Sequence, residues 1–465
     1  MSAVLTDAAV ESRSPQRPDE VVGAFVACSA AQMETAARTA RTAQAEWWAS
    51  GPGARATALS AAAEALAAAS GELAELVIAE VGKPRAEAVG EVDRAVAILR
   101  YNAQLSLVPL GHHLPVAGPV GSLLLDTRRP RGVAGLITPW NFPLAIPLWK
   151  AAPALAAGNA VLLKPAPAAT ATATRLQELL APHLPSGLLT VLPGGTATGA
   201  ALLRSSDVLS FTGSTTVGRT VAAASVAAGI PVQAEMGGLN ASVVLPDADV
   251  AHAAKTIASA AMGYAGQKCT ATSRVIVVGD QPGFVEALTE AVRGLVVGDP
   301  AEERTAVGPV IGAAAREAVT EAVDAARAAG GRVLTGGETR DPGWFVSPVV
   351  IDGLPPQARL NREEVFGPIL SVLHAEDEDS AVQLVNATRY GLVTGLFTRD
   401  LDRALTLVPR FDTGMAKVNG ATSGADYHAS FGGEKDSGYG PAEQGLPALD
   451  FYSRHHTVTY LPTPR

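Results

Sequence analysis

Cysteine is scarce in this sequence, and its scarcity excludes several kinds of chemistry. Only Cys28 and Cys269 occur in the whole chain, so disulfide bonds do not hold the fold together. The sequence has no Cys-x-x-Cys pair, and none of its eight histidines stands at ligand spacing from carboxylates or thiols. We therefore expect no metal site and no redox pair of cysteines.

Strongly basic segments and long uninterrupted apolar runs are also missing. The net charge is −9, and no stripe of lysine and arginine with interleaved aromatic residues occurs, so we expect no nucleic-acid partner. The most apolar stretch, residues 141–163, is interrupted by three prolines, Lys150 and Asn159, so it is not expected to span a membrane. The segment from Met1 to Glu20 is polar and resembles no signal peptide, so we expect a cytoplasmic location.

Apolar residues make up 48% of the chain, and a core of this size predicts two or three domains. Residues 32–103 have a helical pattern that is broken by glycine and proline at 51–53 and 82–84. Shorter segments follow, with strands expected at 120–125, 133–138, 160–164, 188–192 and 208–211 and helices at 145–157, 168–180 and 217–228.

A second series of the same kind begins after Gly237 and Gly238. Its expected strands are 241–245, 274–278, 332–334 and 369–375, and its expected helices are 248–264, 282–296 and 313–329. Repeated alternation of strand and helix predicts parallel sheets covered by helices on both faces. The glycine pair is then the natural hinge between two α/β domains.

Cys269 stands in a run of glycines and polar residues, Gly263-Tyr264-Ala265-Gly266-Gln267-Lys268-Cys269. A lone thiol of this kind is either a small core residue or a nucleophile. Asn141 follows an expected strand and lies between two aromatic residues and two prolines. It either caps the next helix or directs its amide at a developing oxyanion.

Three further segments carry polar groups at the ends of expected strands. Lys164 is either a solvated lysine or a residue at the ligand crevice of an open α/β sheet. The run 210–215 turns through Gly213 into a helix start rich in hydroxyls, which suits a phosphate group, although it is not a Gly-x-Gly-x-x-Gly motif. Glu235 lies between an expected strand and the glycine hinge, upstream of Cys269. It is either an ion-paired residue or a general base whose pKa an apolar setting raises.

Taken in order, these segments resemble motifs of the aldehyde dehydrogenase superfamily, and the resemblance covers nearly the whole chain. The matching motifs are Pro139-Trp140-Asn141-Phe142-Pro143, Lys164-Pro165, Phe211-Thr212-Gly213-Ser214, Glu235-Met236-Gly237-Gly238, Gly266-Gln267-Lys268-Cys269, Glu364-Val365-Phe366-Gly367-Pro368 and Phe431-Gly432-Gly433-Glu434-Lys435. The resemblance implies an α/β fold with three parts. These are a Rossmann-like cofactor domain (1–111 and 131–236), an α/β catalytic domain (237–445) and a β-strand oligomerisation arm (112–130 and 446–465).

The resemblance also implies a mechanism for oxidising an aldehyde to a carboxylic acid. Cys269 attacks the aldehyde, and the Asn141 amide and the Cys269 backbone N–H stabilise the oxyanion of the resulting thiohemiacetal. Hydride then passes to NAD(P), and Glu235 activates the water that hydrolyses the thioester. An acylating enzyme that transfers the thioester to coenzyme A is an alternative, but Glu235 argues against it. A non-catalytic relative is another, but the joint presence of Cys269, Glu235 and Asn141 argues against that.

The binding residues that the resemblance implies form two groups. The expected cofactor contacts are Thr138, Pro139, Trp140, Lys164, Pro167, Gly213, Ser214, Val217, Glu364 and Phe366. Lys164 is expected at the adenosine ribose, Ser214 at the pyrophosphate and Glu364 at the nicotinamide ribose, with Phe366 near the nicotinamide. The expected substrate contacts are Phe142, Lys268, Thr270 and Phe431.

The sequence departs from the family pattern at three places. Members that prefer NAD often carry glutamate where Pro167 stands, so we expect both cofactors to be used, with NADP slightly favoured. The usual N-terminal strand hairpin before Ser14-Pro15 is expected to be absent or truncated. Ser430 replaces a proline that is common before the Phe-Gly-Gly run, which affects the loop expected to anchor the substrate.

Substrate and assembly are the least specified by the sequence. Residues 263–274 and 443–452 look most like those of 2-oxoglutarate-semialdehyde (2,5-dioxopentanoate) dehydrogenases, which favours a small-molecule semialdehyde as substrate. An acidic substrate needs a cation in its pocket, and the sequence does not identify which arginine supplies it. The resemblance also implies assembly by exchange of a strand arm, which residues 120–128 and 456–461 match, so we expect a homodimer or homotetramer.

Overall fold

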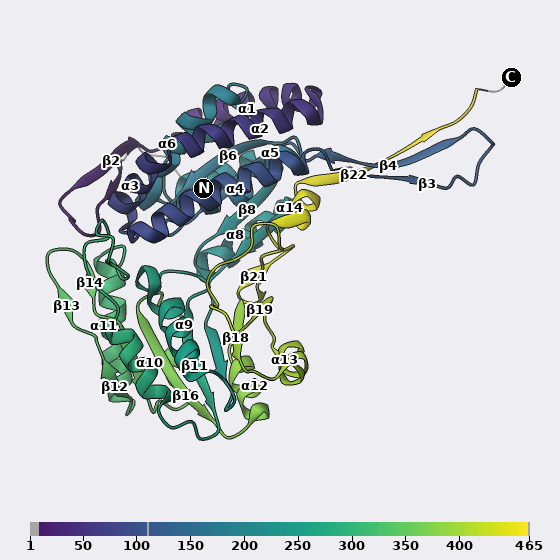
Figure 1. Cartoon of the computed structure of the whole chain (residues 1–465). Helices are drawn as coiled ribbons and strands as arrows, with labels where there is room; N and C mark the ends of the chain where they lie inside the picture. The colour runs from purple at the N-terminus through teal and green to yellow at the C-terminus, as the bar shows by residue number, and fades with distance from the viewer. Residues whose placement is uncertain (1–8, 109–110, 464–465) are drawn as a thin grey trace.

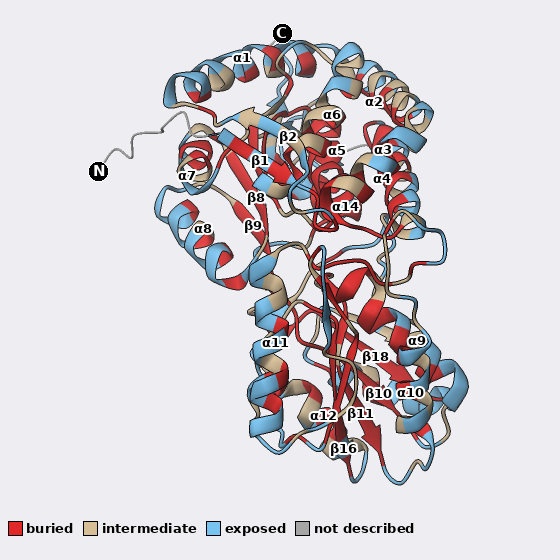
Figure 2. Ribbon diagram, turned by 90° about the vertical axis from the view of Figure 1, so that its left-hand side faces the viewer, coloured by how far each residue is buried: buried red, intermediate tan, exposed pale blue. Residues whose placement is uncertain are grey.

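The computed structural model describes residues 9–108 and 111–463. These residues form two α/β bodies, one above the other in Figure 1, and a thin three-stranded arm that extends away from the upper body. Buried residues follow the two large sheets, and exposed residues lie on the outer faces of the helices (Figure 2). The α/β fold that the alternating pattern predicts is therefore confirmed.

The upper body is built on a six-stranded sheet of order β21-β9-β8-β5-β6-β7. Its strands are β5 (Val133–Thr138), β6 (Ala160–Pro165), β7 (Leu189–Val191), β8 (Val208–Thr212), β9 (Val232–Glu235) and the short antiparallel β21 (Gly438–Tyr439). Neighbours among β5 to β9 pair in parallel. The continuous burial of β5, β6, β8 and β9 is typical of strands covered on both faces.

Helices cover this sheet on both sides. Those connecting its strands are α5 (Ala145–Ala156), α6 (Thr170–Leu180), α7 (Thr196–Ser205) and α8 (Thr215–Ala227). The chain before the sheet forms α1 (Ala30–Ala49), α2 (Gly51–Ala68), α3 (Ser70–Val81) and α4 (Arg85–Leu105). The two expected breaks are confirmed, and a third, which the sequence analysis missed, lies at Ala69, directly before Ser70-Gly71.

The lower body contains a seven-stranded sheet of order β12-β15-β16-β11-β10-β18-β19. Its strands are β10 (Asn240–Val244), β11 (Thr272–Val278), β12 (Arg332–Thr335), β15 (Val349–Asp352), β16 (Ile369–Ala375), β18 (Val393–Phe397) and β19 (Met415–Val418). The helices here are α9 (Val250–Met262), α10 (Phe284–Arg293), α11 (Ala313–Ala328), α12 (Glu378–Asn386) and α13 (Leu401–Leu407). The expected helix 248–264 ends at Met262 because Tyr264 and Ala265 have φ of 53°, which a helix cannot include.

The arm consists of β3 (Gly111–Leu114), β4 (Leu123–Pro130) and β22 (Ser453–Tyr460), with β4 in the centre. The helix α14 (Gly445–Phe451) leads into β22. The strand expected at 120–125 begins only at Leu123, because Pro119 and Gly121 (φ 93°) belong to the turn before it. Two-stranded pairs of β13 (Thr339–Arg340) with β14 (Phe345–Val346), and of β17 (Tyr390–Gly391) with β20 (Glu434–Lys435), complete the sheets.

The hairpin before Ser14-Pro15 that we expected to be absent or truncated falls largely on residues 1–8, but the described chain does form an N-terminal hairpin around that segment. The strands β1 (Ala9–Arg13) and β2 (Val21–Val26) pair antiparallel around the Ser14-Pro15 segment. This hairpin is hard to recognise in the sequence because β2 contains only exposed and half-buried residues and has no buried apolar face. Residues 1–8 lie outside the described part.

The division into a cofactor domain (1–111 and 131–236), a catalytic domain (237–445) and an arm (112–130 and 446–465) remains our proposal. Residues 1–8, 109, 110, 464 and 465 of these ranges are not described. Gly237 and Gly238 connect β9 of the first sheet to β10 of the second, as a hinge between two domains would. Within the described ranges, no helix is long and apolar enough to cross a bilayer.

Candidate active site

The polar motifs of the first half of the chain meet at one edge of the upper sheet. Asn141 follows β5, Lys164 lies at the end of β6, Ser214 follows β8 and Glu235 ends β9. These strands are parallel neighbours in the order β9-β8-β5-β6, so their carboxyl ends lie side by side. The edge that they form faces the lower body (Figure 1), and ligands of open α/β sheets bind at such edges.

Cys269 reaches this edge from the lower body. It follows the turn at Tyr264 and Ala265 that ends α9. The buried Asn141 side chain donates a hydrogen bond of 2.9 Å from Nδ2 to the backbone oxygen of Gln267. This bond holds the amide close to the segment that carries the thiol. The second N–H of that amide and the backbone N–H of Cys269 are therefore the nearby donors that an oxyanion could use.

The surroundings of Cys269 favour the thiol over the thiolate. Burial, followed by the charges of Glu235 and Glu364, raises the pKa of Cys269 to about 12. No cation of the described residues is among the causes of this shift. The nucleophilic thiolate therefore needs a base or an incoming positive charge to form.

Glu235 has the high pKa expected of it. Its side chain is buried, and burial together with the charge of Glu443 raises the pKa of its carboxyl well above the ordinary value. Oε2 makes no hydrogen bond with any described residue. A carboxyl group with one unengaged oxygen can bind a water molecule and, once deprotonated, take its proton.

Behind Glu235 lies an ion pair that the sequence analysis missed. The Lys150 ammonium contacts the carboxylate of Glu443, and both side chains are buried. Ser210 Oγ accepts a hydrogen bond of 2.8 Å from Lys150 and donates one of 3.0 Å to Glu443. The available signal was the lysine itself. Lys150 stands in α5, every residue of which is buried, and an unpaired charge is very costly there.

The residues expected to hold a dinucleotide lie along the same edge. Among them, Thr138 has a buried hydroxyl without a hydrogen-bond partner in the described chain, as do the neighbouring Thr212 and Thr215. Ser214 caps α8 without a side-chain hydrogen bond, so the first N–H groups of that helix are available to a phosphate. Among the described residues, Lys164 donates only to the backbone oxygens of Pro165 and Gly194, at 2.7 and 3.1 Å. These groups fit a dinucleotide, and Pro139, Trp140, Pro167, Gly213 and Val217 lie in the same segments.

Glu364 and Phe366 approach the edge from the lower body. Glu364 Oε1 accepts a hydrogen bond of 3.1 Å from the backbone N–H of Gly238, and a Cβ at Gly237 would lie 1.9 Å from its Oε2. Burial raises the pKa of Glu364 to about 7. The ring of Phe366 is perpendicular to that of Trp140, with centroids 5.9 Å apart. The hinge glycines and the tryptophan thus place both residues.

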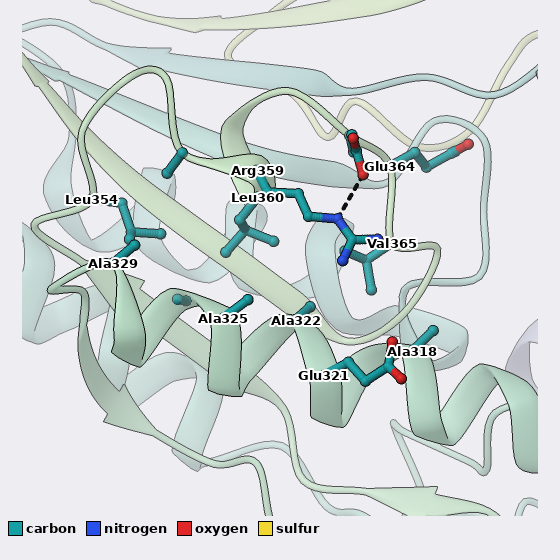
Figure 3. Close-up of a pocket in the computed structure, with 13 residues that line it drawn as sticks. Ala318, Glu321, Ala322, Ala325, Ala329, Leu354, Arg359, Leu360, Glu364 and Val365 are labelled. Carbon is teal, nitrogen blue, oxygen red and sulfur yellow. Dashed lines mark hydrogen bonds and ion pairs between the residues drawn. The ribbon is translucent and has the colours of Figure 1, made fainter.

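On its other side, the segment that carries Glu364 lies over α11. Ala318, Ala322, Ala325 and Ala329 line a cavity of about 100 Å³ between this helix and residues 354–365 (Figure 3). Arg359 crosses the cavity mouth and pairs with Glu363 at 2.6 Å. Cys269 is not among its lining residues, so we do not place the reaction there.

A larger cavity of about 370 Å³ includes Cys269. All four residues expected to contact the substrate line it, namely Phe142, Lys268, Thr270 and Phe431. Lys268 is paired with Glu87 of α4, at 2.7 Å. The same face of α4 also supplies residues that sequence reasoning missed, at positions 87, 90, 91 and 94. Their i, i+3, i+4, i+7 spacing was a signal that one helix face lines the cavity.

Comparisons with known proteins agree with this geometry. The aldehyde dehydrogenase family matches residues 4–458. The chain is 37% identical over 464 residues to an alpha-ketoglutarate semialdehyde dehydrogenase of Haloferax volcanii, covering 97% of this chain and 96% of the relative. It is 36% identical to a geranial dehydrogenase of Castellaniella defragrans, covering 95% and 94% of the two chains.

A solved structure gives the same result for the fold. The NAD-dependent aldehyde dehydrogenase from Sinorhizobium meliloti superposes with a TM-score of 0.94 at 33% identity. The match covers 98% of this chain and 93% of that one.

Proposed function

Because this chain belongs to the aldehyde dehydrogenase family, we propose that it oxidises a semialdehyde that carries a carboxylate, such as 2-oxoglutarate semialdehyde, to the corresponding acid. NAD or NADP is the hydride acceptor in this proposal. The relative from Haloferax volcanii, which acts on alpha-ketoglutarate semialdehyde by its name, supports this substrate. Since the relative from Castellaniella defragrans is named for an uncharged aldehyde, the substrate proposal depends on the cavity itself.

The proposal rests on the position of Arg94. It lines the cavity that contains Cys269, and its guanidinium donates to the backbone oxygen of Ala425. The other charged groups of this wall are already paired, Lys268 with Glu87 and Glu91 with Lys83. Arg94 has no carboxylate within 4.0 Å among the described residues. Burial lowers its pKa, yet a guanidinium stays charged at neutral pH, so it can bind a carboxylate of the substrate.

The catalytic steps use the residues at the sheet edge. Cys269 attacks the aldehyde carbon, and the Asn141 amide with the Cys269 backbone N–H stabilises the oxyanion. NAD(P)⁺, when bound, would supply a positive charge and accept the hydride. Glu235 then removes a proton from the water that hydrolyses the Cys269 thioester. Glu443 and Lys150 act on the pKa of Glu235 in opposite directions, and the glutamate has the larger effect.

Both cofactors are compatible with the residues around the adenosine ribose site. Lys164 offers donors to ribose hydroxyls, and Pro167 places no carboxylate beside the 2′ position. We therefore keep the expectation that NADP and NAD are both used, with NADP slightly favoured.

The arm is proposed to join subunits into a homodimer or homotetramer. Both outer strands of the sheet β22-β4-β3 have an edge with no partner strand in the described chain. Leu114, Leu123 and Tyr460 on this arm are exposed. A narrow sheet of this kind is marginal by itself in water, and pairing with a second copy would cover it.

The test of the substrate proposal uses Arg94→Met and two aldehydes. We expect KM for 2-oxoglutarate semialdehyde to rise at least about tenfold, the loss of one charge-assisted contact. KM for propanal should change less than about twofold, since propanal carries no carboxylate. Arg100→Met is the matched control, because Arg100 stands on α4 but pairs with Glu64 at the surface. Equal changes for both aldehydes would reject the carboxylate substrate.

A further inference from the structure

A second buried ion pair lies beside the cavity that contains Cys269, apart from the pair behind Glu235. The Lys83 ammonium contacts Glu91, and both side chains are completely buried. Desolvating two charges costs as much as their attraction returns, so such a pair contributes little net stability. Its surroundings indicate another role.

Glu91 fixes the start of α5. Its Oε1 accepts hydrogen bonds from the backbone N–H groups of Leu144 and Ala145, at 2.9 and 3.0 Å. The helix has no side-chain cap of its own, so Glu91 supplies from α4 the acceptor and the negative charge that a helix N-terminus favours. Asn141 and Phe142 lie in the turn just before this helix. Glu91 therefore holds the turn that presents the Asn141 amide.

Lys83 contacts both segments of the oxyanion site. Its Nζ lies 3.7 Å from the ring centroid of Phe142 and 4.7 Å from that of Tyr264, within the range of a cation–π contact. Phe142 adjoins Asn141, and Tyr264 begins the left-handed turn that leads to Cys269. Tyr264 is held in turn by a hydrogen bond of 3.0 Å from its hydroxyl to the backbone oxygen of Val81.

We propose that Lys83 and Glu91 are positioning residues that set the distance between the two oxyanion donors, the Asn141 amide and the Cys269 backbone N–H. Lys83 does not line the cavity, and both oxygens of Glu91 are engaged by Lys83, Leu144 and Ala145. They act through the two loops; Glu91 also lies in the cavity wall, but both of its carboxylate oxygens are already engaged. The inference rests on the oxyanion role proposed for Asn141, and it does not depend on the identity of the aldehyde.

The experiment measures the burst of NADH formed in the first turnover, with propanal and saturating NAD. We expect Lys83→Met and Glu91→Gln to slow the burst about tenfold or more, since losing one oxyanion donor costs about 100-fold. KM for propanal and NAD affinity by fluorescence should change less than about threefold. In an Asn141→Ala background, either change should add less than about twofold, because the donor that they position is gone.

Glu80→Gln is the matched control for a general loss of packing. Glu80 is completely buried and accepts the N–H groups of Ala171 and Thr172 at the start of α6, at 2.7 and 2.9 Å, a helix that carries neither oxyanion donor. All three variants should lower Tm, but Glu80→Gln should keep the burst rate. An equal slowing by Glu80→Gln, or full additivity with Asn141→Ala, would overturn the proposal.

The outcomes separate the two proposals. If Asn141→Ala slows the burst while Lys83→Met does not, the positioning proposal fails and the oxyanion role of Asn141 stands. If Asn141→Ala itself leaves the burst unchanged, both the oxyanion role and the positioning proposal fail. The substrate proposal is tested independently through Arg94.

Discussion

Nε1 of Trp149 donates a hydrogen bond of 2.6 Å to Oε2 of Glu443. The tryptophan ring packs against Phe431 of the cavity wall, with centroids 5.3 Å apart. The other oxygen of Glu443 contacts Lys150. One carboxylate thus joins the wall of the substrate cavity to the charges that surround Glu235.

This relationship predicts a pH effect. Burial and the charge of Glu443 raise the pKa of Glu235, and Lys150 opposes them more weakly. Only the deprotonated carboxylate is a base, so thioester hydrolysis should speed up as pH rises through that pKa. Glu443→Gln removes the neighbouring charge that has the larger effect, so the rising limb of the pH–rate profile should move to lower pH. Single-turnover hydrolysis rates measured against pH check this, with the exposed Glu64→Gln as control. An unmoved limb would show that Glu443 does not influence the base.

Cys269→Ala should abolish turnover and leave NAD binding nearly intact, because the thiol forms the covalent bond and does not hold the dinucleotide. Steady-state NADH formation and fluorescence titration of the cofactor measure the two effects. Cys28→Ala, at the other free cysteine, should remain active. A kcat above about one hundredth of the unmodified value in Cys269→Ala would exclude covalent catalysis by this residue.

Glu235→Gln should give one burst of NADH and then stall, because acylation needs the base less than hydrolysis does. Stopped-flow absorbance would resolve the burst, and mass spectrometry would detect the thioester on Cys269. Continued turnover at the unmodified rate would mean that another group activates the water.

Pro167→Glu should raise KM for NADP far more than KM for NAD, since a carboxylate beside the ribose repels a 2′-phosphate. Pro167 is exposed just after β6, so the new side chain has room. Initial rates with both cofactors measure the effect, and Ala168→Glu serves as the neighbouring control. Parallel changes for NAD and NADP would show that residue 167 is remote from the ribose.

Deleting Thr457 to Arg465 should give monomers or aggregates without activity. Residues 457–460 of β22 pair with Asp126 to Leu123 of β4, so the deletion halves the longest pairing in the arm. Light scattering and specific activity measure the outcome. A monomeric, fully active variant would reject a role of the arm in assembly.

The order of elements could be predicted because the buried strands are short, apolar and separated by helical patterns. The carboxyl-end placement of Asn141, Lys164 and Glu235 followed from the same alternation, since parallel strands bring these ends together. The break at Ala69 was missed, although the Ser70-Gly71 pair that follows it was an available signal. The early end of α9 could not be predicted in the same way. Alanine is favourable in helices, and nothing in the residue type marks Ala265 for a positive φ.

The supporting charges of the site were beyond sequence reasoning for a different reason. Lys150 and Glu443 are far apart in the sequence, and their contact depends on how the segment after Phe431 returns to the first sheet. Arg94 lies on α4 and Lys83 in the break just before it, and neither residue belongs to a motif that marks it for a role in the site. Only the packing of α4 against α5 and the thiol loop shows which of its charges face the cavity.

The last segment of the chain has a practical consequence for anyone who modifies this protein. Only the short helix α14 lies between Glu443, which supports the cavity wall through Trp149, and Ser453, where β22 begins. A protein fused to the end of β22, or a surface to which this end is attached, would load a strand that is connected through α14 to the cavity containing Cys269. Force applied to the arm should therefore change the catalytic rate.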